Sequence, residues 1–193
     1  MALSTSLALI GALLTAPAFA QEAPDALLRR VSAELTQHLD VRSGDATKLR
    51  ALVETNLLPH IDARRATQIA LGANWRRATP EQQDQLVREF TTLLVRTYSG
   101  ALANYRDRTI EFLALRAAPA DTEVTVRSRI RQPGAEGIMI EYDLAQTDAG
   151  WKVYDVRVAG ISLVATYRSS FAEEVRNRGV DGLIATLANK NRT

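Results

Sequence analysis

Residues 150–167 read GWKVYDVRVAGISLVATY, and this stretch decides the fold. β-Branched and aromatic residues in its first half predict a strand. Gly160 interrupts the extended run, and Ser162 is suited to cap a helix that carries Val164 and Tyr167 at helical spacing. The stretch contains no catalytic motif and no phosphate-binding loop. A largely apolar strand that turns directly into a helix is predicted to form an apolar wall. This wall encloses either the hydrophobic core or a bound ligand.

Helices are predicted for the residues that precede the strands. Apolar residues at helical spacing mark three segments: 27–39, 49–57 and 86–105. Asp62 is placed to cap a further helix that ends at Gly72. Thr79 and Gln82 form a capping box at the start of the longest helix, with a proline at its first position.

Four strands are predicted after these helices: 110–112, 124–131, 138–144 and 151–158. Apolar and polar residues alternate in them, which predicts an antiparallel sheet with one face in water and one face against the helices. On the water side, Arg127 and Arg129 are expected to pair with Glu141 and Asp143. The alternation changes phase in the last strand, which predicts a bulge near residues 154–155. The pattern therefore predicts an α+β fold with helices packed on one face of a four-stranded antiparallel sheet.

The N-terminus has the features of an export signal. Residues 7–14 form a short apolar run, and Ala18-Phe19-Ala20 supplies the small residues that a signal peptidase reads. We predict that residues 1–20 are a cleaved signal peptide and that residues 21–193 form a single domain. The sequence has no cysteine, and an exported protein without disulfides is more typical of the bacterial periplasm than of animal secretion.

Composition argues against nucleic-acid binding, metal binding and catalysis. The formal net charge is only +2, and the arginines are dispersed instead of lying on one face among aromatic residues. His38 and His60 lack the spacing of metal ligands, and no thiolate is available. The sequence has no nucleophile elbow, Walker loop or dinucleotide-binding motif. We therefore expect no catalytic residues, no metal and no cofactor.

Asp155 leaves an enzyme open as an alternative. It is an acid in an otherwise apolar strand, which would suit a general acid of raised pKa in a small cavity enzyme. The competing interpretation is a carboxylate satisfied at the bulge or by a helix N-terminus. A further alternative is a pure interaction module whose apolar residues all belong to the core.

Residues 150–168, together with RGVDGLIATL at 178–187, resemble the C-terminal signature of the MlaC family, also called the toluene-tolerance family. LLPHID at 57–62 and LGANWRRATPEQ at 71–82 fall where that family has similar stretches. The resemblance covers nearly all of the chain after the signal peptide. It implies that the helices pack on a curved sheet, related to the NTF2-like shape, and enclose an apolar cavity.

The resemblance also implies a function. Members are periplasmic carriers of glycerophospholipid that move lipid between an outer-membrane lipoprotein–porin complex and an inner-membrane ABC transporter complex, and so maintain outer-membrane lipid asymmetry. We therefore expect a monomer with a phospholipid ligand and transient contacts with these membrane complexes. We predict the residues that form the lipid-binding wall from two criteria: the spacing of apolar residues directs them inward, and they belong to the elements that the family uses. They are Leu94, Tyr98, Leu102, Val126, Ile140, Tyr142, Val153, Val156, Ile161, Val164 and Tyr167.

Overall fold

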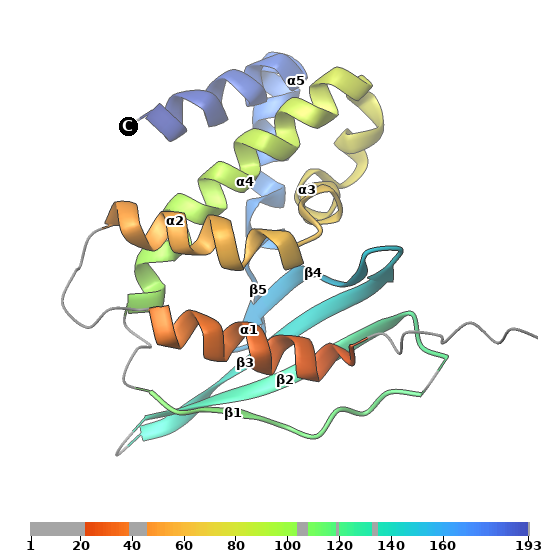
Figure 1. Ribbon diagram of the computed structural model, residues 1–193. Coiled ribbons are helices and arrows are strands. Elements are labelled where there is room, and N and C mark those ends of the chain that lie inside the picture. Colours follow the sequence, from red (N-terminus) through yellow and green to blue (C-terminus); the bar gives the residue numbers. More distant parts are fainter. Residues whose placement is uncertain (1–21, 39–45, 104–107, 119, 133–134, 193) are drawn as a thin grey trace, which may run out of the picture.

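The computed structural model describes residues 22–38, 46–103, 108–118, 120–132 and 135–192. The predicted signal peptide lies outside these residues. Figure 1 shows an α+β protein in which most helices are grouped on one side and the strands on the other. None of the helices in the described ranges is long and apolar enough to cross a lipid bilayer.

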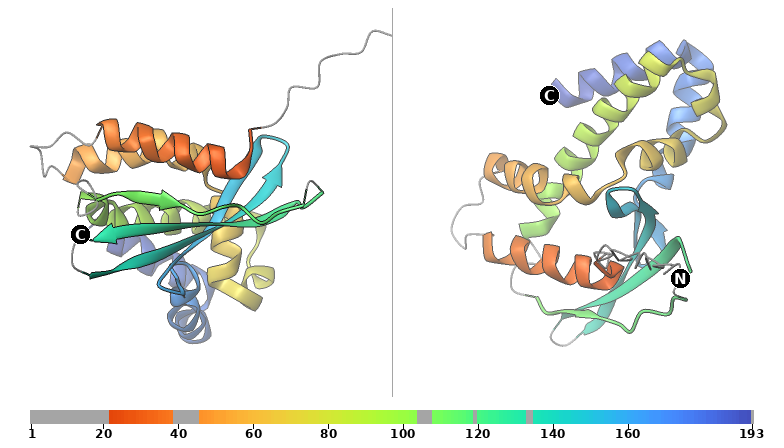
Figure 2. Two further views of the ribbon diagram at one scale, coloured as in Figure 1. Left: turned by 90° about the horizontal axis from the view of Figure 1, so that it is seen from below. Right: turned by 45° about the vertical axis from the view of Figure 1, so that its right-hand side comes forward.

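The strands form one antiparallel sheet in which neighbours follow chain order. Their bounds are β1 Ile110–Phe112, β2 Glu123–Gln132, β3 Ala135–Thr147, β4 Gly150–Val158 and β5 Ile161–Ser162. The four predicted strands are confirmed, and the sheet is open and curved (Figure 2). The sequence predicts a helix from Ser162 onward, and this is wrong, because β5 pairs with β4 at that point.

A tight turn at Ala159 and Gly160 explains the fifth strand. Both residues have positive φ, 50° and 81°, which is the requirement of a type I′ hairpin turn. The turn brings Ile161 opposite Val158 and directs the chain back along β4. The break at Gly160 is therefore the middle of a hairpin and not the boundary between a strand and a helix.

The start of the following helix is displaced accordingly. The Ser162 hydroxyl accepts a hydrogen bond from the Ala165 backbone N–H at 2.9 Å, so Ser162 does stabilise a helical turn. That turn is the 3₁₀ helix η3, Ala165–Tyr167, and the α-helix α5, Arg168–Arg192, begins after it. Gly179 interrupts α5 with a φ of 72°, a left-handed backbone value that glycine adopts without steric cost.

The strained turn yields a first prediction. Left-handed φ costs an alanine about 1 kcal/mol, whereas asparagine adopts it readily and is favoured in type I′ turns. Ala159→Asn is therefore expected to raise the free energy of unfolding by about 1 kcal/mol, measured by urea denaturation. Ala149→Asn, at an exposed alanine in the hairpin turn between β3 and β4, is the matched control and is expected to change stability by less than about 0.5 kcal/mol. Equal effects of the two substitutions would contradict the assignment of strain to Ala159.

The predicted bulge in β4 is confirmed. Asp143 pairs with Asp155 while Leu144 pairs with Val153, so Tyr154 is the extra residue. Because of this insertion, Val153 and the residue three positions later, Val156, lie on the same face of the sheet.

The helices of the first half are α1 Pro24–His38, α2 Ala46–Asn56, η1 Leu58–His60, α3 Ala63–Leu71, η2 Gly72–Arg77 and α4 Pro80–Ala103. The predicted cap of α3 is confirmed, because the Asp62 carboxylate accepts from the Arg65 N–H at 2.9 Å. The capping box of α4 is confirmed too. The Thr79 N–H donates to the Gln82 side chain at 3.0 Å, and the Gln82 N–H donates to the Thr79 hydroxyl at 3.3 Å.

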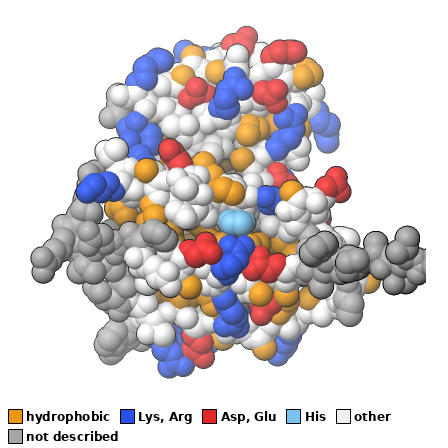
Figure 3. All heavy atoms as spheres, in the orientation of Figure 1, with side chains coloured by type: hydrophobic (Ala, Val, Ile, Leu, Met, Phe, Trp, Pro, Cys, Tyr) orange, Lys and Arg blue, Asp and Glu red, His pale blue; other side chains and the backbone are white. Residues whose placement is uncertain are grey.

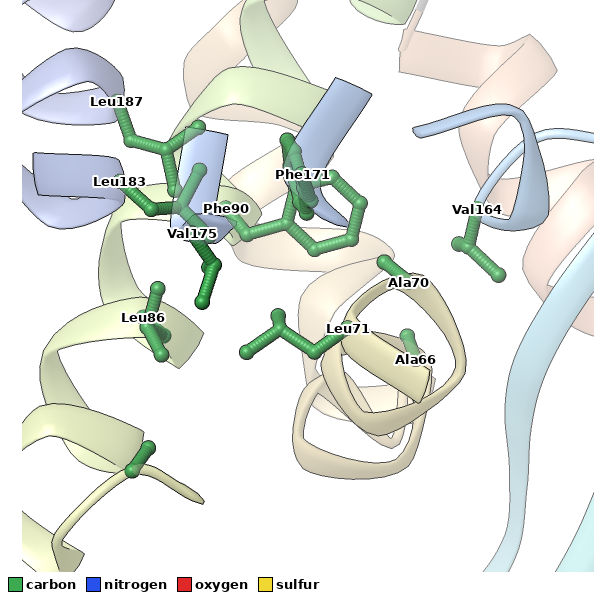
Figure 4. Close-up of a cluster of buried hydrophobic side chains, with 11 residues drawn as sticks. Ala66, Ala70, Leu71, Leu86, Phe90, Val164, Phe171, Val175, Leu183 and Leu187 are labelled. Atoms are coloured by element: carbon green, nitrogen blue, oxygen red, sulfur yellow. The ribbon is translucent and has the colours of Figure 1, made fainter. Parts of the chain in front are cut away.

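Buried apolar side chains gather in two separate clusters. The helical cluster joins α3, α4, η3 and α5 and consists of Ala66, Ala70, Leu71, Ala78, Leu86, Phe90, Val164, Phe171, Val175, Leu183 and Leu187 (Figure 4). The sheet cluster joins α1 to the inner face of the sheet and consists of Leu27, Leu28, Val31, Val124, Val126, Leu144 and Val153. The boundary between the two clusters lies at β4, whose backbone bonds to Asp62 before α3 and to Leu163 before η3.

Candidate functional site

One side of this boundary is the inner face of the sheet. It carries five of the predicted wall residues: Val126, Ile140, Tyr142, Val153 and Val156. Val126 is 0 % exposed inside the sheet cluster, and its cross-strand neighbour Tyr142 is only half-buried. Val156, opposite Tyr142 on the next strand, is half-buried as well. The helices therefore cover this apolar face incompletely at Tyr142 and Val156.

The other side of the boundary is the edge of the helical cluster. Leu94 and Tyr167 pack against that cluster while remaining partly exposed. The Tyr167 ring meets the Phe90 ring edge-on, with centroids 5.1 Å apart. Val164 is buried and lies at the edge of the cluster nearest the strands (Figure 4). Burial, together with a hydrogen bond with Tyr167, raises the pKa of Tyr98 to about 12.

Strand β4 connects the two sides. The Asp62 N–H at the start of α3 donates to the Val153 carbonyl at 2.8 Å, and the Leu163 N–H donates to the Val156 carbonyl at 2.9 Å. The side chains of both valines thus lie on the inner face of the sheet, while their backbone carbonyls accept hydrogen bonds from residues on the helical side. These hydrogen bonds join β4 directly to the residue before α3 and to the segment before η3.

Two more predicted wall residues are Leu102 and Ile161. The side chain of Leu102, near the end of α4, lies outside the described part of the chain. Ile161 is 62 % exposed on β5, just after the hairpin turn. It lies opposite Val158, which pairs with Ile140, so register places it on the inner face of the sheet, at an edge strand that the helices leave uncovered. The remaining predicted residues are divided between two facing surfaces and do not form one continuous cluster.

The space-filling view shows the same boundary from outside. Hydrophobic side chains are visible at mid-height on this face, to either side of a histidine and a group of acidic and basic side chains (Figure 3). Further charged side chains lie above and below this level (Figure 3). Apolar surface is therefore exposed where the helices above meet α1 and the sheet below.

Two parts of the site escape the sequence patterns. The helical period of α1 predicts an amphipathic helix, and only the structure places Leu28 and Val31 on the inner face of the sheet. Ser128 and Tyr142 form a hydrogen bond of 3.4 Å on that same face. The signal in the sequence is a serine among the alternating apolar positions of β2, since the other inward positions from Val124 to Ile130 carry valine or isoleucine.

The outer face of the sheet carries ion pairs. The predicted pair of Arg127 with Glu141 is confirmed at 2.9 Å. The predicted pair of Arg129 with Asp143 is wrong, since Asp143 binds Arg157 of β4 instead. Register is the reason, because Arg129 lies opposite Met139 and not opposite Asp143. Hydrogen bonds from Arg157 and Arg127 lower the pKa of Glu141.

Asp155 also lies on the outer face, opposite Asp143. It is buried, and its carboxylate accepts a hydrogen bond from the Val156 backbone N–H at 2.8 Å. This supports the interpretation of a carboxylate satisfied at the bulge. Because it lies on the face opposite the wall residues, Asp155 is not placed to act on a guest at the boundary between the clusters.

Known proteins resemble this chain over 55 % to 91 % of its length. The intermembrane phospholipid transport system binding protein MlaC of Haemophilus influenzae is 24 % identical over 182 residues, which are 91 % of this chain and 85 % of that protein. The toluene tolerance protein ttg2D of Pseudomonas putida is 30 % identical over 108 residues, 55 % of this chain and 49 % of that protein.

A solved structure and a family profile agree with these relatives. The phospholipid-binding protein from Ralstonia solanacearum, solved in complex with a phospholipid, matches with a TM-score of 0.78 and 39 % identity and covers 86 % of this chain and 96 % of that one. The profile of the MlaC protein family matches residues 25–189, which include every helix and strand from Asp25 of α1 to Asn189 of α5. The chain belongs to the MlaC family.

Proposed function

We propose that this protein binds a phospholipid and holds its acyl chains between the helical cluster and the inner face of the sheet. The observation that carries the proposal is the Ralstonia solanacearum structure, which shares 39 % identity and the fold with this chain and contains a phospholipid. The half-buried Tyr142 and Val156 support it, because a guest lying against them would complete the cover of the sheet.

The proposed wall consists of Leu94, Tyr98, Leu102, Val126, Ile140, Tyr142, Val153, Val156, Val164 and Tyr167, with Ile161 at its outer margin. Roughly 28 methylenes of a two-tailed lipid, at about 0.8 kcal/mol each, cost more than 20 kcal/mol in water. A carrier therefore has to offer an apolar enclosure, whereas it needs no reactive side chain. The polar head group stays near solvent, since placing a charge between apolar walls would be costly.

We further propose that the protein acts in the periplasm and carries phospholipid between the outer and inner membranes. The support is its membership of the MlaC family, the name of the Haemophilus influenzae relative and the predicted signal peptide. In this role it exchanges lipid with an outer-membrane lipoprotein–porin complex and an inner-membrane ABC transporter complex, binds each transiently as a monomer, and maintains the asymmetry of the outer membrane.

Solvent extraction tests the binding proposal. The full chain is expressed with its own N-terminus, purified from the periplasmic fraction without detergent, and extracted with organic solvent for mass spectrometry. Phospholipid in molar proportion to protein is expected. An unrelated exported protein purified by the same route is the control for carried-over membrane. An extract without phospholipid, from protein that also takes up none from vesicles, would favour the enzyme or interaction-module alternative.

A further inference from the structure

The inner face of the sheet contains a polar pair among aliphatic side chains. Ser128 on β2 is 0 % exposed, and its hydroxyl donates to the Tyr142 hydroxyl of β3 at 3.4 Å. Phe112 of β1 stacks against the Tyr142 ring, with centroids 6.3 Å apart and planes 27° apart. The phenol is thus held between strands, and burial raises its pKa.

The hydrogen bonds of this pair are incomplete. Two hydroxyls carry two protons, and the bond between them uses one. In the described ranges, the second proton, which belongs to Tyr142, has no acceptor. A phenol O–H in apolar surroundings usually finds a partner, since leaving it unbonded costs free energy. Tyr142 is half-buried while Ser128 is fully covered, so the phenol is the member of the pair that a guest can reach.

We propose that the Tyr142 hydroxyl donates a hydrogen bond to an acyl ester carbonyl of the bound glycerolipid, so that the protein prefers ester-linked to ether-linked lipid. This rests on the proposed function. A hydrocarbon tail offers no acceptor, and an ether oxygen accepts more weakly than a carbonyl. The ester carbonyl accepts without bringing a donor or a charge of its own into the wall, which fits a lone O–H on an apolar face.

A competition between two lipids tests this. Vesicles contain equal amounts of a diacyl phosphatidylcholine and its dialkyl ether counterpart with the same chain lengths, and the lipid taken up by the full protein is quantified by mass spectrometry. We expect the wild-type protein to take up about three- to tenfold more diacyl lipid, the contribution of one hydrogen bond. Tyr142→Phe removes only the hydroxyl and is expected to bring the ratio close to one.

Two matched variants separate this role from a structural one. Tyr154→Phe removes a phenol hydroxyl from the outer face, where it contacts Glu123, and is expected to keep the preference. Ser128→Ala leaves the Tyr142 donor in place and is also expected to keep it. If Ser128→Ala and Tyr142→Phe lose the preference equally, the hydrogen bond between the two residues has a structural role in the sheet, and the proposal is overturned.

The remaining outcomes are equally decisive. Equal uptake of both lipids by the wild-type protein overturns this inference and leaves phospholipid binding standing, whereas uptake of neither overturns the proposed function itself. If Tyr142→Phe does not fold, infrared spectra of wild-type protein loaded with carbonyl-labelled lipid provide the test. One ester band shifted to lower frequency than in vesicles supports the hydrogen bond, and an unshifted band refutes it.

Discussion

Phe90→Ala is expected to lower the free energy of unfolding by about 3–5 kcal/mol, measured by urea denaturation. Phe90 is 0 % exposed and lies at the centre of the helical cluster (Figure 4). Its ring meets Tyr167 and Phe171 edge-on, with centroid distances of 5.1 and 5.2 Å. The substitution loses these contacts and leaves a cavity between α4 and α5 that the surrounding helices can close only in part.

Gln85→Ala, at an exposed position of the same helix, is the control and is expected to stay within about 0.5 kcal/mol of the wild-type protein. A Phe90→Ala variant that unfolds at the wild-type urea concentration would show that the helical cluster contributes little to stability. Because Tyr167 also belongs to the proposed wall, the variant is expected to bind lipid more weakly even at low temperature, where it remains folded.

Val156→Glu is expected to abolish most phospholipid binding, with bound lipid falling at least about tenfold. Val156 is half-buried opposite Tyr142, so a glutamate there can stay hydrated as long as no lipid is present. An acyl chain lying against it would remove that water, at a cost of several kcal/mol. The measurement is the amount of lipid extracted per mole of protein, with circular dichroism as the check on folding.

Ala149→Glu adds the same charge on the exposed turn between β3 and β4 and is expected to leave lipid content unchanged. A folded Val156→Glu protein with a full complement of lipid would remove this part of the sheet from the proposed wall. It would not by itself contradict lipid binding, which the extraction of the wild-type protein tests.

The sequence predicts those features that depend on neighbours along the chain. Asp62 caps α3 and Thr79 with Gln82 caps α4, because each cap joins residues three positions apart. Period-two alternation locates the long strands, and its change of phase locates the bulge at Tyr154. The resemblance to the MlaC family likewise rests on linear motifs, and the family profile matches residues 25–189.

Tertiary structure decides which of these elements meet. Because of the register of β2 against β3, Asp143 forms its ion pair with Arg157 and not with Arg129. The hairpin turn at Ala159 leaves Ile161 exposed. The division of the apolar residues into two clusters, and the meeting of Ser128 with Tyr142, likewise depend on strand register and helix packing. Local spacing fixes the face on which a side chain lies, because backbone geometry repeats over a few residues. The partner across that face comes from a distant part of the chain, so only the folded structure determines it.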